Sequence, residues 1–116
     1  MNITQWQLLQ ATVHYGLHFI APALLAWCFF RSQWKRAWLL MAATIVVDVD
    51  HLLATPIFDP TRCSIGFHPL HTWPAMLVYV VLLFPSSTRI VALGLLFHML
   101  TDFQDCYWTA YILSLQ

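Results

Sequence analysis

The sequence predicts an all-α integral membrane protein that folds as a single four-helix bundle over residues 1–116. Of these 116 residues, 60% are hydrophobic and 9% are charged, whereas soluble proteins average about 25% charged residues. The apolar residues form four runs separated by polar connections, and in lipid such runs satisfy their backbone hydrogen bonds only as helices. The net charge of zero, with no basic stripe, argues against a nucleic-acid partner.

The four predicted helices cover approximately residues 6–30, 38–54, 70–84 and 90–113. A membrane-spanning helix needs about 20 apolar residues. The first and fourth segments therefore span comfortably, while the second and third are short. Local thinning of the bilayer or packing against the longer helices would accommodate the two short segments.

Basic residues indicate how the bundle is oriented. Arg31, Lys35 and Arg36 lie between the first two segments, and Arg89 lies between the last two. Because basic loops are retained on the cytoplasmic side, both termini and the long loop over residues 55–67 are expected on the outer, periplasmic side. The predicted location is the bacterial inner membrane, crossed several times. Only Arg62 falls on the outer side.

Two of the three cysteines, Cys63 and Cys106, are expected at the outer side, and Cys28 near the cytoplasmic side. A bond between Cys63 and Cys106 is compatible with an oxidising periplasm. The sequence does not supply the Cα separation that a disulfide requires. We therefore favour free, buried thiols.

All four segments contain metal-ligand-type side chains in the outer half of the membrane, as judged from the helix rise of about 1.5 Å per residue. A carboxylate in the centre of a membrane helix costs about 2.5–3.5 kcal/mol on the most lenient scale. Arg31, Arg36 and Arg89 are expected on the opposite side, so only Arg62 could neutralise these groups. We therefore predict a metal site. Its candidate ligands are His14, His18, Asp48, Asp50, His51, His68, His71, His98 and Asp102, of which Asp50 and His71 are also the candidate catalytic residues.

Helix spacing groups several of these residues. His14 and His18 share a face, as do Asp48 and His51. His98, Asp102 and Asp105 share another. Asp50 points elsewhere on a regular helix, so either the helix loosens before Pro56, or Asp50 supports another ligand or binds a neighbouring metal ion. His18 and His68 could instead form interhelical hydrogen bonds, and Asp59 and Asp105 could be solvated.

Mixed His and Asp ligands favour zinc, with manganese or iron as alternatives. The number of ligands suggests two ions bridged by a carboxylate, which is the usual apparatus for hydrolysing phosphate esters. A site in the outer half of the bilayer would favour a lipid or lipid-linked phosphoester that enters between the helices. A homodimer would help four short helices to bury so many polar groups.

Three motifs resemble those of the bacterial inner-membrane-associated (LexA-binding) metal-dependent hydrolase group, which has an N-terminal His followed by D-x-D-H, H-x4-H-S and S-H-x3-D motifs. The similar stretches here are Val47-Asp48-Val49-Asp50-His51, Phe67-His68-Pro69-Leu70-His71-Thr72 and His98-Met99-Leu100-Thr101-Asp102. The resemblance implies metal binding by His14 or His18, Asp48, Asp50, His51, His71, His98 and Asp102. Three features depart from the pattern. The paired histidines are spaced H-x2-H, Thr72 stands where serine is usual, and Phe97 replaces the serine before His98. The chain resembles more closely a family of small bacterial membrane proteins without an assigned function, and more distantly the zinc-dependent phospholipases C.

Two other classes of function compete with a hydrolase. A haem-binding bundle would also use histidines on facing helices, although haem does not need the accompanying carboxylates. A metal or proton-coupled transporter would also place His and Asp inside the membrane, although here the inner half offers no polar path. A structural subunit predicts that loss of Asp48 or His98 leaves the metal content unchanged.

Overall fold

The computed structural model describes residues 1–116, which form helices and no strand. The all-α prediction is confirmed. The elements are α1 (Ile3–Phe19), α2 (Ala21–Phe29), η1 (Arg31–Gln33), α3 (Trp34–Ala42), η2 (Ala43–Leu53), η3 (Pro69–His71), α4 (Trp73–Val81) and α5 (Arg89–Ser114). The η elements are 3-10 helices.

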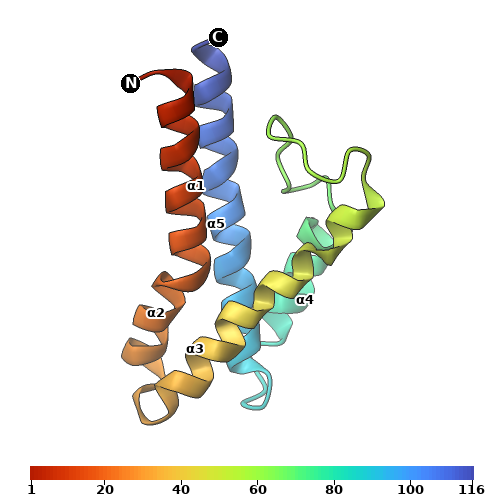
Figure 1. Ribbon diagram of the computed structural model, residues 1–116. Coiled ribbons are helices and arrows are strands. Elements are labelled where there is room, and N and C mark those ends of the chain that lie inside the picture. Colours follow the sequence, from red (N-terminus) through yellow and green to blue (C-terminus); the bar gives the residue numbers. More distant parts are fainter.

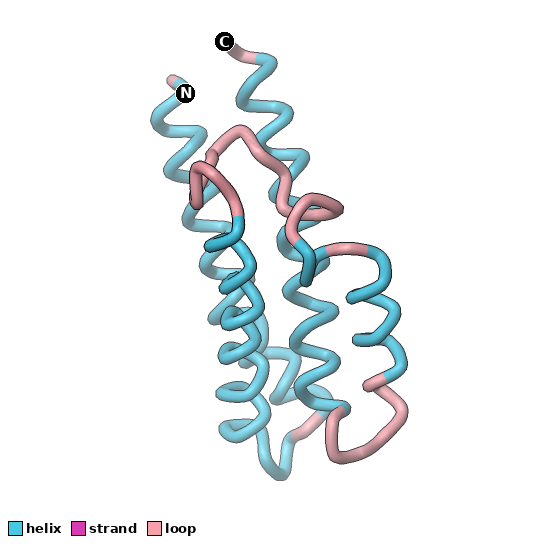
Figure 2. Tube along the Cα trace, turned by 90° about the vertical axis from the view of Figure 1, so that its right-hand side faces the viewer, coloured by secondary structure: helices cyan, strands magenta, loops and turns pink.

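These elements form four helical rods (Figure 1). The first rod is α1 with α2, which bends at Ile20 just before Pro22. The second is α3 with η2, the third is α4, and the fourth is α5. Both termini and the long loop after η2 lie towards one end of the molecule, here called the loop end (Figures 1 and 2). The turns between α2 and α3 and between α4 and α5 lie at the other, turn end.

Only one helical stretch, Ile3–Phe29 near the N-terminus, is long and apolar enough to cross a membrane. Buried core helices and signal sequences can meet the same criterion. The second, third and fourth rods do not meet it, so the expectation that the fourth segment spans a membrane is not confirmed.

The second rod changes from α to 3-10 winding at Ala43, and this change turns Asp50 into the core. Met41, Thr44, Val47 and Asp50 are all buried, at intervals of three residues. A 3-10 helix has 3.0 residues per turn and stacks such a row on one face, whereas an α-helix would place Asp50 about half a turn away from Met41. Loosening before Pro56 was one of the two alternatives for Asp50, and the helix instead tightens.

Gly94 of α5 allows the second rod to approach closely. A Cβ atom at Gly94 would lie 2.8 Å from Cα of Met41 and 2.9 Å from Cγ2 of Thr44. Met41 also packs with Ala26, Ala37 and Ile90 in an apolar cluster at the turn end. This contact fixes the buried row of the second rod against α5, from which two further site residues project.

The expectation of free, buried thiols is wrong. Cys63 and Cys106 form a disulfide with a Cα–Cα distance of 5.0 Å, and Cys28 is free and exposed. The tip of the long loop is directed back towards α5 (Figure 1), and the disulfide joins the two. The bond ties the loop to α5 close to Asp105.

Candidate metal centre

Four side chains from three elements converge in what we call the central group, which comprises Asp48, His71, His98 and Asp102. Nε2 of His71 lies 3.1 Å from Oδ1 of Asp48 and 3.1 Å from Oδ2 of Asp102. Nε2 of His98 lies 3.1 Å and 3.2 Å from the same two oxygens. A zinc ion with bonds of 2.0–2.1 Å in tetrahedral geometry separates its ligand atoms by about 3.3 Å. The four N···O distances therefore match the ligand spacing around a tetrahedral zinc ion.

The charge of the central group also fits a cation. His71 and His98 are 0% and 2% exposed, and Asp102 is 5% exposed. No Lys or Arg forms an ion pair anywhere in the structure, since all nine pairs involve histidine. Buried carboxylates are costly unless they are paired or bound to a metal. A divalent ion would balance the two aspartates here.

Asp50 lies behind the central group and orients one of its ligands. Its Oδ2 accepts hydrogen bonds from the backbone N–H of Leu70 and from Nδ1 of His71, both at 2.9 Å. Because a carboxylate only accepts, Nδ1 of His71 is the donor and Nε2 keeps its lone pair for the central group. Metal-bound histidines commonly have a carboxylate in this position.

A second set of side chains, the α1 group, consists of His14, His18 and Asp102. Nε2 of His18 lies 3.3 Å from Oδ1 of Asp102, and the rings of His14 and His18 are 4.4 Å apart. Nδ1 of His14 is buried without a hydrogen-bond partner, 3.7 Å from Oδ1 of Asp105. Asp102 therefore turns Oδ2 to the central group and Oδ1 to the α1 group, which is the position of a bridging carboxylate.

A third set, the loop group, consists of Asp50, His51 and His68, whose ligand-type atoms also lie close enough to hold an ion. Nδ1 of His51 lies 3.1 Å from Oδ1 of Asp50, and the rings of His51 and His68 stack at 3.8 Å. Imidazole binds a metal in its ring plane, so stacked rings do not direct their nitrogens to one point. The loop group is therefore the weakest of the three as a metal site.

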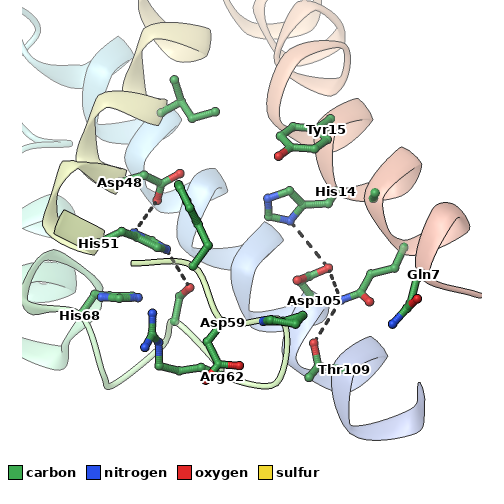
Figure 3. Close-up of a pocket in the computed structure, with 16 residues that line it drawn as sticks. Gln7, His14, Tyr15, Asp48, His51, Asp59, Arg62, His68, Asp105 and Thr109 are labelled. Carbon is green, nitrogen blue, oxygen red and sulfur yellow. Dashed lines mark hydrogen bonds and ion pairs between the residues drawn. The ribbon is translucent and has the colours of Figure 1, made fainter. Parts of the chain in front are cut away.

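A cavity of about 610 Å³ lies next to these groups. Figure 3 shows Asp48, His51 and His68 on one side of it and His14 and Asp105 on the other, with Arg62 on the loop. Asp48 and His51 border the cavity from η2, and His14 borders it from α1. The cavity thus gives a small molecule access to side chains of all three groups.

Asp59 in the long loop and His68 directly after it have shifted pKa values. Burial, together with the neighbouring His51, lowers the pKa of His68 and so favours its neutral form. Two hydrogen bonds from Thr61 hold the pKa of the Asp59 carboxyl below its usual range. Asp59 is thus ionised, with one oxygen already occupied within the loop.

All nine predicted ligands lie in one of the three groups, and His18 also bonds across helices to Asp102. Asp105, which we predicted to be either solvated or part of a helix face, lies at the cavity beside His14. The sequence signal for this placement was the spacing of Asp105 from His98 and Asp102, which puts all three on one helix face. Gln10 and Thr109 were not anticipated. The Gln10 side chain donates to both Asp105 and Thr109 at 3.1 Å.

Comparison with known proteins gives one result. A family model described as a family of unknown function (DUF6122) matches residues 8–109. No curated protein and no solved structure matches the chain. The match covers the three groups and the cavity, apart from Gln7 at the rim.

Proposed function

The chain belongs to the DUF6122 family, and we propose that it is a membrane-embedded, metal-dependent hydrolase of phosphoesters. The observation that supports this most directly is the Asp102 carboxylate, which presents one oxygen to each of two groups of histidines. Zinc suits the mixed nitrogen and oxygen ligands and the tetrahedral spacing of the central group, with manganese or iron as alternatives.

In this proposal His71, His98 and Asp48 would hold one ion and His14 and His18 the other, with Asp102 available to both. Two zinc ions held by these residues would activate water and neutralise charge on phosphoryl oxygens. Asp50 orients His71 through its hydrogen bond to Nδ1, so it is a positioning residue. Asp105 borders the cavity beside His14 and faces the space where a substrate would lie.

Placement in the inner membrane, with several crossings, is supported by the apolar residues exposed on every rod. Examples are Leu24, Leu39, Leu77 and Leu100, which are 67%, 66%, 66% and 59% exposed. The second rod is also longer than its residue count suggests. With 9 α-helical and 11 3-10 residues it extends about 35 Å, compared with a hydrocarbon core of about 30 Å. The four basic residues of the turn end would face the cytoplasm.

Two observations favour a hydrolase over the competing classes. All three groups lie on the loop-end side of an apolar cluster of Ala26, Ala37, Met41 and Ile90. None of the three groups extends to the turn end, whereas a transporter would need polar side chains along its whole path. Nε2 of each histidine in the central group contacts two carboxylates, whereas a haem ligand needs none.

Metal content and activity of detergent-purified protein test the proposal. We expect about two equivalents of zinc per chain by elemental analysis, and hydrolysis of p-nitrophenyl phosphate or of phosphatidic acid in mixed micelles. Asp102→Ala removes the bridge and should lose both ions and the activity. Asp59→Ala is the matched control, because Asp59 is a carboxylate of the same cavity outside the three groups. This variant should keep both zinc ions. Wild-type protein without stoichiometric metal, or Asp102→Ala with full metal content, would contradict the proposal.

A further inference from the structure

The cavity beside the metal-binding groups contains one fixed cationic side chain, Arg62. We infer that Arg62 binds the phosphoryl group of the ligand, and that this ligand is a phosphate ester whose head group is polar and hydrogen-bonding. The inference deepens the proposed function and rests on it for the reaction.

Arg62 is held in place by the loop that carries it. Its Nη2 donates to the main-chain carbonyls of Pro56 and Ile57, both at 2.9 Å, and its guanidinium stacks 4.8 Å from the ring centre of Phe67. The next residue, Cys63, is bonded to Cys106 of α5. Arg62 is therefore fixed relative to Asp102 and Asp105, which lie on the same helix as Cys106.

Arg62 forms no ion pair, although the charge of the nearby Asp59 interacts with it over a longer distance. Oδ1 of Asp59 already accepts from Thr61. Its two hydrogen bonds use Nη2 alone, so the donors on Nε and Nη1 stay free. A planar guanidinium with free donors is suited to bind phosphate oxygens in a bidentate way. Figure 3 shows Arg62 across the cavity from Asp105 and Thr109.

The remaining lining indicates the chemistry of the head group. The cavity, of about 610 Å³, lies in the size range of small-molecule sites, which is about 300–1,000 Å³. Gln7, Gln10, Tyr15, Ser64 and Thr109 supply amides and hydroxyls along its walls, and only 4 of its 16 lining residues are hydrophobic. The lining therefore suits a phosphate on a polar alcohol, whether soluble or the head group of a lipid whose chains remain outside.

Inorganic phosphate is the probe that tests Arg62. Zinc-loaded protein, freed of excess metal, is titrated with phosphate by isothermal calorimetry. Arg62→Gln should weaken binding by about ten-fold or more, the loss expected for charge-assisted hydrogen bonds. Arg62→Lys keeps the charge without the fork and should fall in between. Arg89→Gln is the matched control, because Arg89 also donates to two main-chain carbonyls, those of Leu83 and Phe84, but at the turn end.

Several outcomes would decide the matter. Phosphate affinity equal to wild type in Arg62→Gln, with metal still bound, overturns the inference and leaves the metal site standing. If the wild type holds no metal, the proposed function fails, and the same titration of metal-free protein still tests Arg62. Thermal unfolding checks that each variant is folded. If Arg62→Gln does not fold, the phosphate affinity of Arg62→Lys decides between the two outcomes.

Competition identifies the source of the phosphoryl group. Glycerol 3-phosphate and phosphatidic acid in nanodiscs are each tested for displacement of phosphate. Displacement by the first indicates a soluble ester, displacement by the second indicates a lipid head group, and either supports the inference. Failure of both to compete overturns it.

Discussion

At the scale of the residue, the role of each aspartate follows from the atoms that face its two oxygens. Asp102 faces Nε2 of His18 with one oxygen and Nε2 of His71 with the other. Asp50 instead faces Nδ1 of His71 and the backbone N–H of Leu70. Both carboxylates are buried, but Asp102 faces Nε2 atoms of histidines in the central and α1 groups, whereas Asp50 faces the Nδ1 atoms of His51 and His71. The geometry thus separates a bridging ligand from a group that orients a ligand.

Asp50→Ala should weaken zinc binding without removing a binding site. Loss of a carboxylate behind a metal-bound histidine typically costs about 10–100-fold in affinity, and the released Nδ1–H of His71 would lose its fixed tautomer. The measurement is a competition titration of zinc against a chelator, with the stoichiometry recorded at saturating zinc. Asp59→Ala should match the wild type. If Asp50→Ala loses a full equivalent at saturation, Asp50 is a ligand and not a positioning residue.

At the scale of the element, the 3-10 winding of η2 decides which side chains reach the site. It stacks Thr44, Val47 and Asp50 in one buried row and leaves Asp48 on the neighbouring row, at the edge of the cavity. Runs of 3-10 helix longer than 3–4 residues are uncommon, and η2 has 11. Its packing against α5 at Gly94 and the bonds of Asp50 to η3 hold this run in place.

Gly94→Ala should therefore damage both the fold and the site. The new Cβ would meet the backbone of Met41 at 2.8 Å, which a side-chain rotation cannot relieve. Overpacking of this kind typically costs about 1–3 kcal/mol, and the displaced rod would carry Asp48 and Asp50 away from His71. We expect a lower midpoint of thermal unfolding in detergent, followed by tryptophan fluorescence, and a reduced zinc content.

Gly16→Ala is the matched control for this prediction. Gly16 also lies within a helix, but a Cβ there meets no atom within 4 Å. Alanine is favoured over glycine in a helix by about 0.5–1 kcal/mol, so this variant should be at least as stable as the wild type. Equal behaviour of the two variants would show that the contact between α5 and the second rod is not tight.

The elements show what the sequence could and could not predict. The apolar runs predicted four helical segments, because each run is long and bounded by polar connections. The winding of residues 43–53 could not be predicted, because Ile45, Val46, Val47 and Val49 leave no apolar periodicity that separates 3.0 from 3.6 residues per turn. Depth counting placed the nine predicted ligands at one level. It could not show that Asp102 is shared, since this depends on how each rod is rotated about its axis.

At the scale of the whole molecule, the two ends differ in chemistry. The loop end holds the three groups, the cavity and the Cys63–Cys106 bond, while the turn end holds Arg31, Lys35, Arg36 and Arg89. Disulfides persist in oxidising compartments such as the periplasm. Basic loops are retained in the cytoplasm. In the proposed membrane placement, both features would put the loop end outside.

Reporter fusions test this orientation. Alkaline phosphatase, which is active only in the periplasm, should be active when fused after Gln116 and inactive when fused after Ser87, in the turn between α4 and α5. Green fluorescent protein at the same two positions should give the opposite pattern, because it fluoresces after folding in the cytoplasm. The two fusion points are expected on opposite sides of the membrane, because only α5 lies between them and it would cross once. The reverse pattern would place the metal-binding groups on the cytoplasmic side, and equal phosphatase activity at both points would mean that α5 does not cross the membrane.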